Sequence, residues 1–276
     1  MKPAPFDLLI ADSLEEALAC LHEHGEDARI IAGGQSLMAM LNMRLAHPSV
    51  LVDVTRLRDL SYIRCKGDWL EVGATTTQAE LLAWPELATR APLLAQALPY
   101  VGHFQTRNRG TVCGSLCHAD PSSEIPLALA TLGGEVVLKS RKGKRVLAAQ
   151  DFQTGMLTTA RRPDEMVVAA RFRLQEDLAR FGFREVARRH GDFAIVSIAA
   201  MKTAKTLCLG VGGVAERPTI QTFDAQSAED LEAALNAFAW QLGGSDDIHA
   251  SARYRREMVR RLGHTLLQEV SNAAAS

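Results

Sequence analysis

The segment IIAGGQSLM (residues 30–38) joins an apolar run, two glycines and the start of a helical pattern. Residues 28–32 predict a buried strand, residues 33–36 a turn, and residues 37–43 a short helix. Glycines let backbone N–H groups approach a ligand closely, and a helix N-terminus adds positive electrostatic potential. The segment therefore predicts either a phosphate or pyrophosphate site, or a tight strand-to-helix turn that binds no ligand.

Other uses of this segment are disfavoured by its own residues. Neither the GxxxxGK[ST] pattern of a P-loop nor the GxGxxG dinucleotide fingerprint is present. Gly34, Gln35 and Ser36 resemble half of a hydrolase nucleophile elbow, but Met38 stands where the second glycine belongs. A hydrolase also needs an earlier strand and loop for its oxyanion hole, and the 35 residues before Ser36 leave little room for them.

The flanking residues predict a small α/β layer over residues 1–55. A strand at residues 6–10 precedes a helix that begins with a capping box, Ser13 with Glu16, and ends at Gly25. Further strands are predicted at residues 28–32 and 50–54. The order strand, helix, strand, turn, helix, strand is typical of parallel neighbours in one sheet.

The rest of the chain predicts two further regions. Residues 56–175 are predicted to form a second α/β region, with strands at 69–74 and 165–172 and a hairpin at 135–148 that turns at Lys142–Gly143. The same region contains a capping box of Thr77 with Glu80 and an apolar helix at 124–132. Residues 176–276 predict three antiparallel strands, at 181–189, 193–202 and 206–214, and then two helices. The first of these helices has one apolar face, formed by Leu231, Ala234, Leu235, Phe238 and Leu242. The predicted fold class is α+β, with domains at 1–175 and 176–276.

Composition narrows the class of protein. A formal net charge of −1 argues against nucleic-acid binding, and no apolar run is long enough to span a bilayer. The N-terminus turns acidic where a signal peptide would stay apolar, so we expect a cytoplasmic protein. The five cysteines form no secreted-type framework and no CxxC pair, so any iron–sulfur cluster must come from another chain. The basic run RYRREMVRR (residues 253–261) is interpreted as one side of a helix.

The stretch TVCGSLCHADPSSE (residues 111–124) allows three interpretations. As a metal site, Cys113, Cys117 and His118 lack a recognised ligand spacing. As a nucleophile, a cysteine needs a positioned base, and sequence proximity to His118 does not supply one. As a ligand-binding loop, the stretch offers hydroxyl groups, a glycine for close approach, and the carboxylates Asp120 and Glu124. Two phosphate-type loops on different α/β units predict one long ligand between them, such as FAD.

Four segments in this order resemble a known family. They are AGGQSLMAMLNMRLAHPSVLVDV (32–54), RGTVCGSLCHADPSSEIPLALATLGGEVVL (109–138), FREVARRHGDFAIVSIAA (183–200) and DDIHASARYRREMVRRL (246–262). They are similar to segments of the FAD-binding medium subunit of molybdenum hydroxylases. That family includes xanthine dehydrogenase, carbon monoxide dehydrogenase and N-heteroaromatic dehydrogenases. The resemblance implies a two-part, PCMH-type FAD-binding domain followed by a C-terminal flavoprotein domain.

The resemblance also implies residue roles. A first group would wrap the pyrophosphate and a second would form the other cradle, with Glu124 or Asp120 binding ribityl or ribose hydroxyls. Arg184 would lie beside the isoalloxazine, where a cation stabilises reduced flavin, and Phe193 would cover one ring face. One departure is Cys113, which stands where the family has a glycine. The implied cofactor-binding residues are Ala32, Gly33, Gly34, Gln35, Ser36, Leu37, Val101, Thr111, Val112, Cys113, Gly114, Ser115, Asp120, Glu124, Met166, Arg184 and Phe193.

The implied activity is electron transfer, with no catalytic substrate chemistry and no metal on this chain. A large molybdopterin subunit and a small subunit with 2Fe-2S clusters would be its partners, in a dimer of heterotrimers, and FAD would pass electrons to an external acceptor. Two alternatives remain open from the sequence. One is a stand-alone flavin oxidoreductase with its own substrate, and the other is a non-catalytic nucleotide-binding module.

Overall fold

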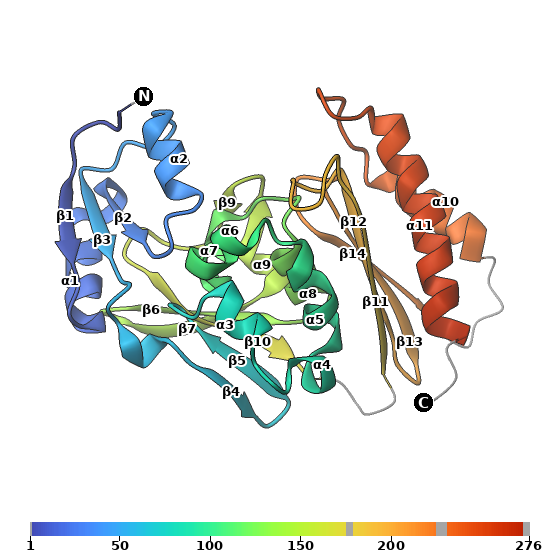
Figure 1. The fold of residues 1–276 in the computed structure, drawn as a ribbon, viewed down its shortest axis with the longest axis horizontal. Coiled ribbons are helices and arrows are strands. Elements are labelled where there is room, and N and C mark those ends of the chain that lie inside the picture. The colour runs from blue at the N-terminus through green and yellow to red at the C-terminus, as the bar shows by residue number, and fades with distance from the viewer. Residues whose placement is uncertain (1, 175–178, 225–230, 273–276) are drawn as a thin grey trace.

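The computed structural model describes residues 2–174, 179–224 and 231–272. The chain forms three successive parts that lie side by side, from the N-terminal sheet through a central part to a C-terminal sheet with two long helices (Figure 1). The predicted domain boundary at residues 175/176 lies outside the described residues. No helix within the described ranges has the length and apolarity needed to cross a membrane.

The N-terminal part is the predicted parallel layer. Its strands β1 (Asp7–Ile10), β2 (Ala28–Ile31) and β3 (Val50–Asp53) are ordered β1-β3-β2, and both pairs are parallel. Helix α1 (Leu14–His24) begins where the Ser13 hydroxyl accepts from the Glu16 N–H and ends at Gly25, whose φ of 54° suits glycine. The Glu16 carboxylate accepts from Asp12 instead of Ser13, so the predicted capping box is only half formed.

The central part contains a second sheet, ordered β4-β5-β10-β6-β7, in which every neighbouring pair is antiparallel. The predicted strands and hairpin are present, and Thr77 with Glu80 forms a complete capping box. The sheet therefore differs from the parallel N-terminal layer. Its strands are β4 (Ile63–Lys66), β5 (Trp69–Gly73), β6 (Glu135–Ser140), β7 (Gly143–Ala148) and β10 (Met166–Arg173), with a small ladder of β8 (Gln153–Gly155) and β9 (Thr158–Thr159).

The central part also contains short helices. Besides α8 (Glu124–Thr131) they are α3 (Gln78–Leu82), α4 (Leu87–Arg90), α5 (Pro92–Ala97), α6 (Phe104–Arg109), α7 (Val112–His118) and α9 (Ala149–Phe152). Helix α2 (Leu37–Asn42) belongs to the N-terminal part, and α8 (Glu124–Thr131) to the central core. Single 3-10 turns lie at Gly25–Asp27, Arg58–Leu60 and Leu98–Tyr100.

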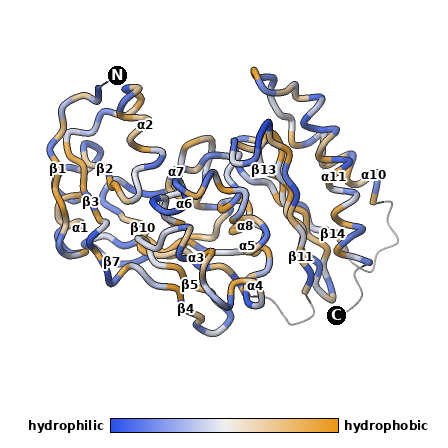
Figure 2. Tube along the Cα trace, in the orientation of Figure 1, coloured by the Kyte–Doolittle hydropathy of each residue, from blue (hydrophilic) through white to orange (hydrophobic). Residues whose placement is uncertain are grey.

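The C-terminal sheet has four antiparallel strands in sequence order, β11 (Arg180–Val186), β12 (Val196–Lys202), β13 (Thr206–Gly212) and β14 (Thr219–Asp224). The three predicted strands are present, and β14 is an addition that its short, largely polar sequence did not indicate. Helices α10 (Leu231–Gln241) and α11 (Ala252–Asn272) cover the outer face of the sheet (Figure 1). Apolar residues follow the strands and α8 (Figure 2).

Helix α8 joins the central part to the C-terminal sheet. Leu127 and Ala128 are fully buried, because one side of α8 packs on β12 and β13 and the other on the central helices. Gly210 on β13 allows this close packing, since a Cβ there would lie 2.2 Å from the Thr131 hydroxyl oxygen. Helix α8 is therefore held between the central part and the C-terminal sheet.

Candidate functional site

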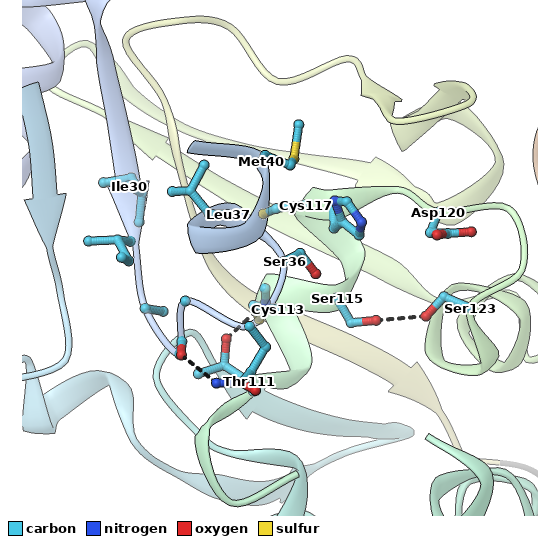
Figure 3. Close-up of a pocket in the computed structure, with 18 of the residues that line it drawn as sticks. Ile30, Ser36, Leu37, Met40, Thr111, Cys113, Ser115, Cys117, Asp120 and Ser123 are labelled. Atoms are coloured by element: carbon cyan, nitrogen blue, oxygen red, sulfur yellow. Dashed lines mark hydrogen bonds between the residues drawn. The ribbon is translucent and has the colours of Figure 1, made fainter. Parts of the chain in front are cut away.

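A cavity of about 680 Å³ lies between the N-terminal and central parts, and the segment after β11 completes its wall. Figure 3 shows Ser36 and Leu37, at the start of α2, on one side and Ser115 and Cys117 of α7 on the other. Most of the predicted site residues line this cavity: Ala32, Gly33, Gly34, Gln35, Ser36, Leu37, Val101, Thr111, Cys113, Gly114, Ser115, Asp120, Glu124, Met166 and Phe193.

The first segment presents free backbone donors to the cavity. Within the described part of the chain, the N–H groups of Gly34, Gln35 and Ser36 have no hydrogen-bond acceptor. Gly33 lies against the end of α6, where a Cβ would fall 1.9 Å from the Arg109 carbonyl oxygen. Glycine is therefore required to bring this turn against the central part. The result is a cluster of N–H donors suited to an anion.

Residues 112–118 of the second segment form helix α7, so the expectation of a loop is wrong there, whereas residues 119–123 form the turn before α8. Thr111 is the N-cap of α7, and its hydroxyl accepts from the Gly114 N–H at 3.0 Å. The Ser115 N–H bonds to the Thr111 carbonyl, so both of these backbone donors are already used inside the chain. The Ser115 hydroxyl lies 2.9 Å from that of Ser123 (Figure 3). This side of the cavity offers hydroxyl groups more than N–H groups.

Cys113 points into the core. Its side chain is 2% exposed, and Sγ lies 3.8 Å from the Val72 carbonyl oxygen on β5. Burial raises the pKa of this thiol well above its usual value, so it is not an activated nucleophile. Within the described ranges, no group of three His, Cys, Asp or Glu side chains could hold a metal ion. A cysteine at this position is therefore compatible with an open cavity.

Glu124 is the most perturbed acid in the cavity wall. It is 6% exposed at the first turn of α8. Burial raises the pKa of Glu124 to about 7, and the negative charge of Asp120 contributes to the rise. A hydrogen bond from the backbone N–H of Glu124 itself acts in the opposite direction. The Asp120 carboxylate instead accepts from the Ser122 N–H at 2.8 Å, which holds the turn before α8.

Two predicted residues lie outside the cavity. Val112 is fully buried in the core of the central part. Arg184 extends from the opposite face of β11, where its Nη2 lies 2.7 Å from the Glu269 carboxylate on α11. Their roles beside a cofactor stay predictions, and the structure gives Arg184 another partner.

The cavity wall also contains residues that the sequence did not predict, among them Arg29, Arg161 and Gln78. Arg29 on β2 and Arg161 both line the cavity wall. Burial lowers the pKa of Arg161, and the positive charge of Arg29 lowers it further, whereas Cys117 acts in the opposite direction. Gln78 also lines the cavity, and its buried Oε1 has no partner in the described residues. The position of Arg29 just before the glycines was a usable signal. Arg161 and Gln78 reach the cavity only through long-range packing.

The donor set fits a dinucleotide. Free N–H groups of the Gly34–Ser36 turn suit a pyrophosphate, hydroxyls and Glu124 suit sugar hydroxyls, and Val101, Met166 and the exposed Phe193 suit an aromatic ring. These groups come from all three parts of the chain. A long, extended ligand such as FAD matches this spread.

Comparison with known proteins decides the family. Residues 4–172 match the family described as "FAD binding domain in molybdopterin dehydrogenase", and residues 181–270 match "CO dehydrogenase flavoprotein C-terminal domain". This chain is a medium subunit of the molybdenum hydroxylase family. The medium subunit is 34% identical to the 6-hydroxypseudooxynicotine dehydrogenase complex subunit alpha of Paenarthrobacter nicotinovorans, over 99% of this chain and 97% of the relative.

Solved structures agree with this assignment. The medium subunit superimposes on quinoline 2-oxidoreductase from Pseudomonas putida 86 with a TM-score of 0.88, at 32% identity and full coverage of both chains. Carbon monoxide dehydrogenase from Oligotropha carboxidovorans gives a TM-score of 0.89 at 28% identity, over 99% of this chain and 100% of that one. The predicted family and the α+β fold class are confirmed.

Proposed function

We propose that this medium subunit binds FAD in the cavity and passes electrons from a partner's iron–sulfur clusters to an external acceptor. The observation that carries the proposal is the set of acceptor-free N–H groups at Gly34, Gln35 and Ser36, which line the same cavity as a buried acid, Glu124. FAD, when bound, supplies chemistry that takes electrons singly and releases them singly or as a pair.

Each part of the cavity has a binding task. The Gly34–Ser36 turn donates to the pyrophosphate, because its N–H groups lack other acceptors. Glu124, once ionised, accepts from ribityl or ribose hydroxyls. Val101 and Met166 contribute apolar wall, and Phe193, which is 69% exposed, is free to lie on one ring face. These residues bind and orient the cofactor, and none of them performs substrate chemistry.

The subunit would work in a cytoplasmic complex with a large molybdenum-cofactor subunit and a small iron–sulfur subunit, assembled as a dimer of heterotrimers. Two observations support this arrangement. The relatives include a dehydrogenase complex subunit and a carbon monoxide dehydrogenase medium chain. The chain also has no CxxC pair for a cluster of its own.

Purification of the native complex tests the proposal. Size-exclusion chromatography combined with molybdenum, iron and flavin analysis should show this chain eluting with a larger and a smaller partner, with all three components present. A chain that elutes alone and whose flavin is reduced directly by a substrate would instead be a stand-alone oxidoreductase. A chain that holds nucleotide without any redox change would be a binding module.

A further inference from the structure

A second carboxyl, that of the half-buried residue Glu185, has a buried oxygen, Oε2, and lies near enough to Glu124 to be affected by its charge. Along β11, side chains alternate between two faces. Gly182 faces α11, since a Cβ there would lie 2.5 Å from the Leu266 Cδ1 atom, and Arg184 faces α11 through its ion pair with Glu269. The intervening Glu185 therefore faces the other way, toward the central part of the molecule.

The row of residues across the sheet places Glu185 near the start of α8. Glu185 lies opposite Ser197 on β12, and Ser197 lies opposite Gly212 on β13. A Cβ at Gly212 would lie 2.6 Å from the Ser197 Oγ and 3.2 Å from the Pro121 carbonyl oxygen. The next residue, Gly213, donates its N–H to the same carbonyl at 2.8 Å. This row therefore reaches the segment that leads into Glu124.

Two polar atoms in this row are buried and unsatisfied. Glu185 Oε2 and Ser197 Oγ have no hydrogen-bond partner within the described part of the chain. An unpaired buried carboxylate is costly, whereas a protonated carboxyl is neutral and can donate a hydrogen bond. Burial, together with the charge of nearby Glu124, accordingly raises the pKa of Glu185 to about 8.

We propose that Glu185 is a positioning residue for Glu124: protonated, it backs the cavity wall as a neutral acid, so the pair carries one negative charge, and its ionisation repels Glu124 and weakens FAD binding. This proposal rests on the proposed function of the cavity. It predicts that the site is competent only while Glu124 is ionised and Glu185 is not.

Few other titratable groups face this side of β11. Asp120 acts on Glu124, and Tyr100 contacts Phe183 on the same face, with His190 stacked on the Tyr100 ring. Helix α5 carries no charged residue, and Glu124 is the one charged residue of α8. Arg184 and Glu269 lie on the opposite face of the strand.

The carboxyl pair is tested first without FAD. Carbon-13 NMR of the full chain, labelled at glutamate side-chain carboxyls, should show two resonances that titrate near pH 7 and pH 8, lost in E124Q and E185Q respectively. E124Q should also shift the Glu185 titration to lower pH, because the Glu124 charge is gone. A Glu185 that is already ionised at pH 6, or that E124Q leaves unmoved, would overturn the proposal.

FAD affinity is then measured against pH by flavin fluorescence. Wild-type affinity should peak between pH 7 and 8, with limbs that approach tenfold per pH unit because one proton is linked on each side. E185Q should lose the alkaline limb and E124Q the acid limb. The control E86Q removes an exposed carboxylate 4.0 Å from Arg90 and should keep the wild-type profile.

The outcomes separate the two proposals. An alkaline limb that persists in E185Q would contradict the role of Glu185 while leaving FAD binding intact. A chain whose carboxyls titrate as expected but which binds no FAD at any pH would overturn the proposed function, and with it the effect on affinity.

Discussion

Substitution of Glu124 by Gln should stabilise the FAD-free chain at neutral pH. Glu124 is 6% exposed, and its pKa of about 7 in the fold compares with 4.5 as the ordinary value. The folded state therefore holds a proton that the unfolded chain releases. Wild-type stability is full below the unfolded pKa and falls as pH rises from 4.5 to 7. A difference of roughly 2.5 pKa units corresponds to about 3 kcal/mol.

The assay is urea unfolding of FAD-free wild type and E124Q between pH 4 and 8. The stability advantage of E124Q should be near zero at pH 4 and approach about 3 kcal/mol at pH 8. E86Q is the matched control, because Glu86 is exposed and makes only a long ion pair. Its stability should follow that of wild type throughout.

E124Q should meanwhile bind FAD more weakly at pH 8, because a neutral amide replaces the carboxylate that accepts from sugar hydroxyls. Stability and binding would thus move in opposite directions, as expected where a buried charge is kept for function. A stability difference that is flat with pH, or largest at pH 4, would show that Glu124 does not retain a proton in the folded chain.

Three further predictions concern a glycine, a helix cap and a buried carboxylate. G33A should lower FAD affinity at least tenfold in a fluorescence titration, because its Cβ would lie 1.9 Å from the Arg109 carbonyl oxygen. The control G155A should bind FAD normally, because a Cβ there would lie near only one flexible side-chain atom, at 3.7 Å. T111A removes the N-cap of α7 and should cost about 1 kcal/mol in urea unfolding, an effect that would be absent if the cap were unimportant. Burial would raise the pKa of Glu71, but three donated hydrogen bonds hold that pKa at about 2. The folded chain should therefore lose about 3 kcal/mol of stability between pH 4.5 and pH 2, and E71Q should lack this acid-dependent loss.

Local features were predictable from the sequence. The parallel N-terminal layer, the turn at residues 33–36, the Thr77 capping box and the apolar α8 each depend on residues close together in the chain. The sequence also predicted most of the site residues, because they belong to two segments that together resemble the family. These residues line one cavity in the structure.

Features set by tertiary packing were not predictable. The sequence predicts a ligand-binding loop where the structure has helix α7, because the glycine and two cysteines of this segment are weak helix formers. The direction of the Arg184 side chain depends on which face of β11 packs against α11, and the sequence alone does not show that face. The same alternation directs Glu185 toward Glu124, so this pair emerged only from the fold.

The proposed function requires that this chain hold FAD in its cavity. The most direct measurement is the amount of FAD released on denaturation of the purified full chain, before and after incubation with added FAD. One FAD per chain, with a flavin absorption spectrum, is the predicted result. A chain that carries no flavin and takes up none when FAD is added would contradict FAD binding in this cavity.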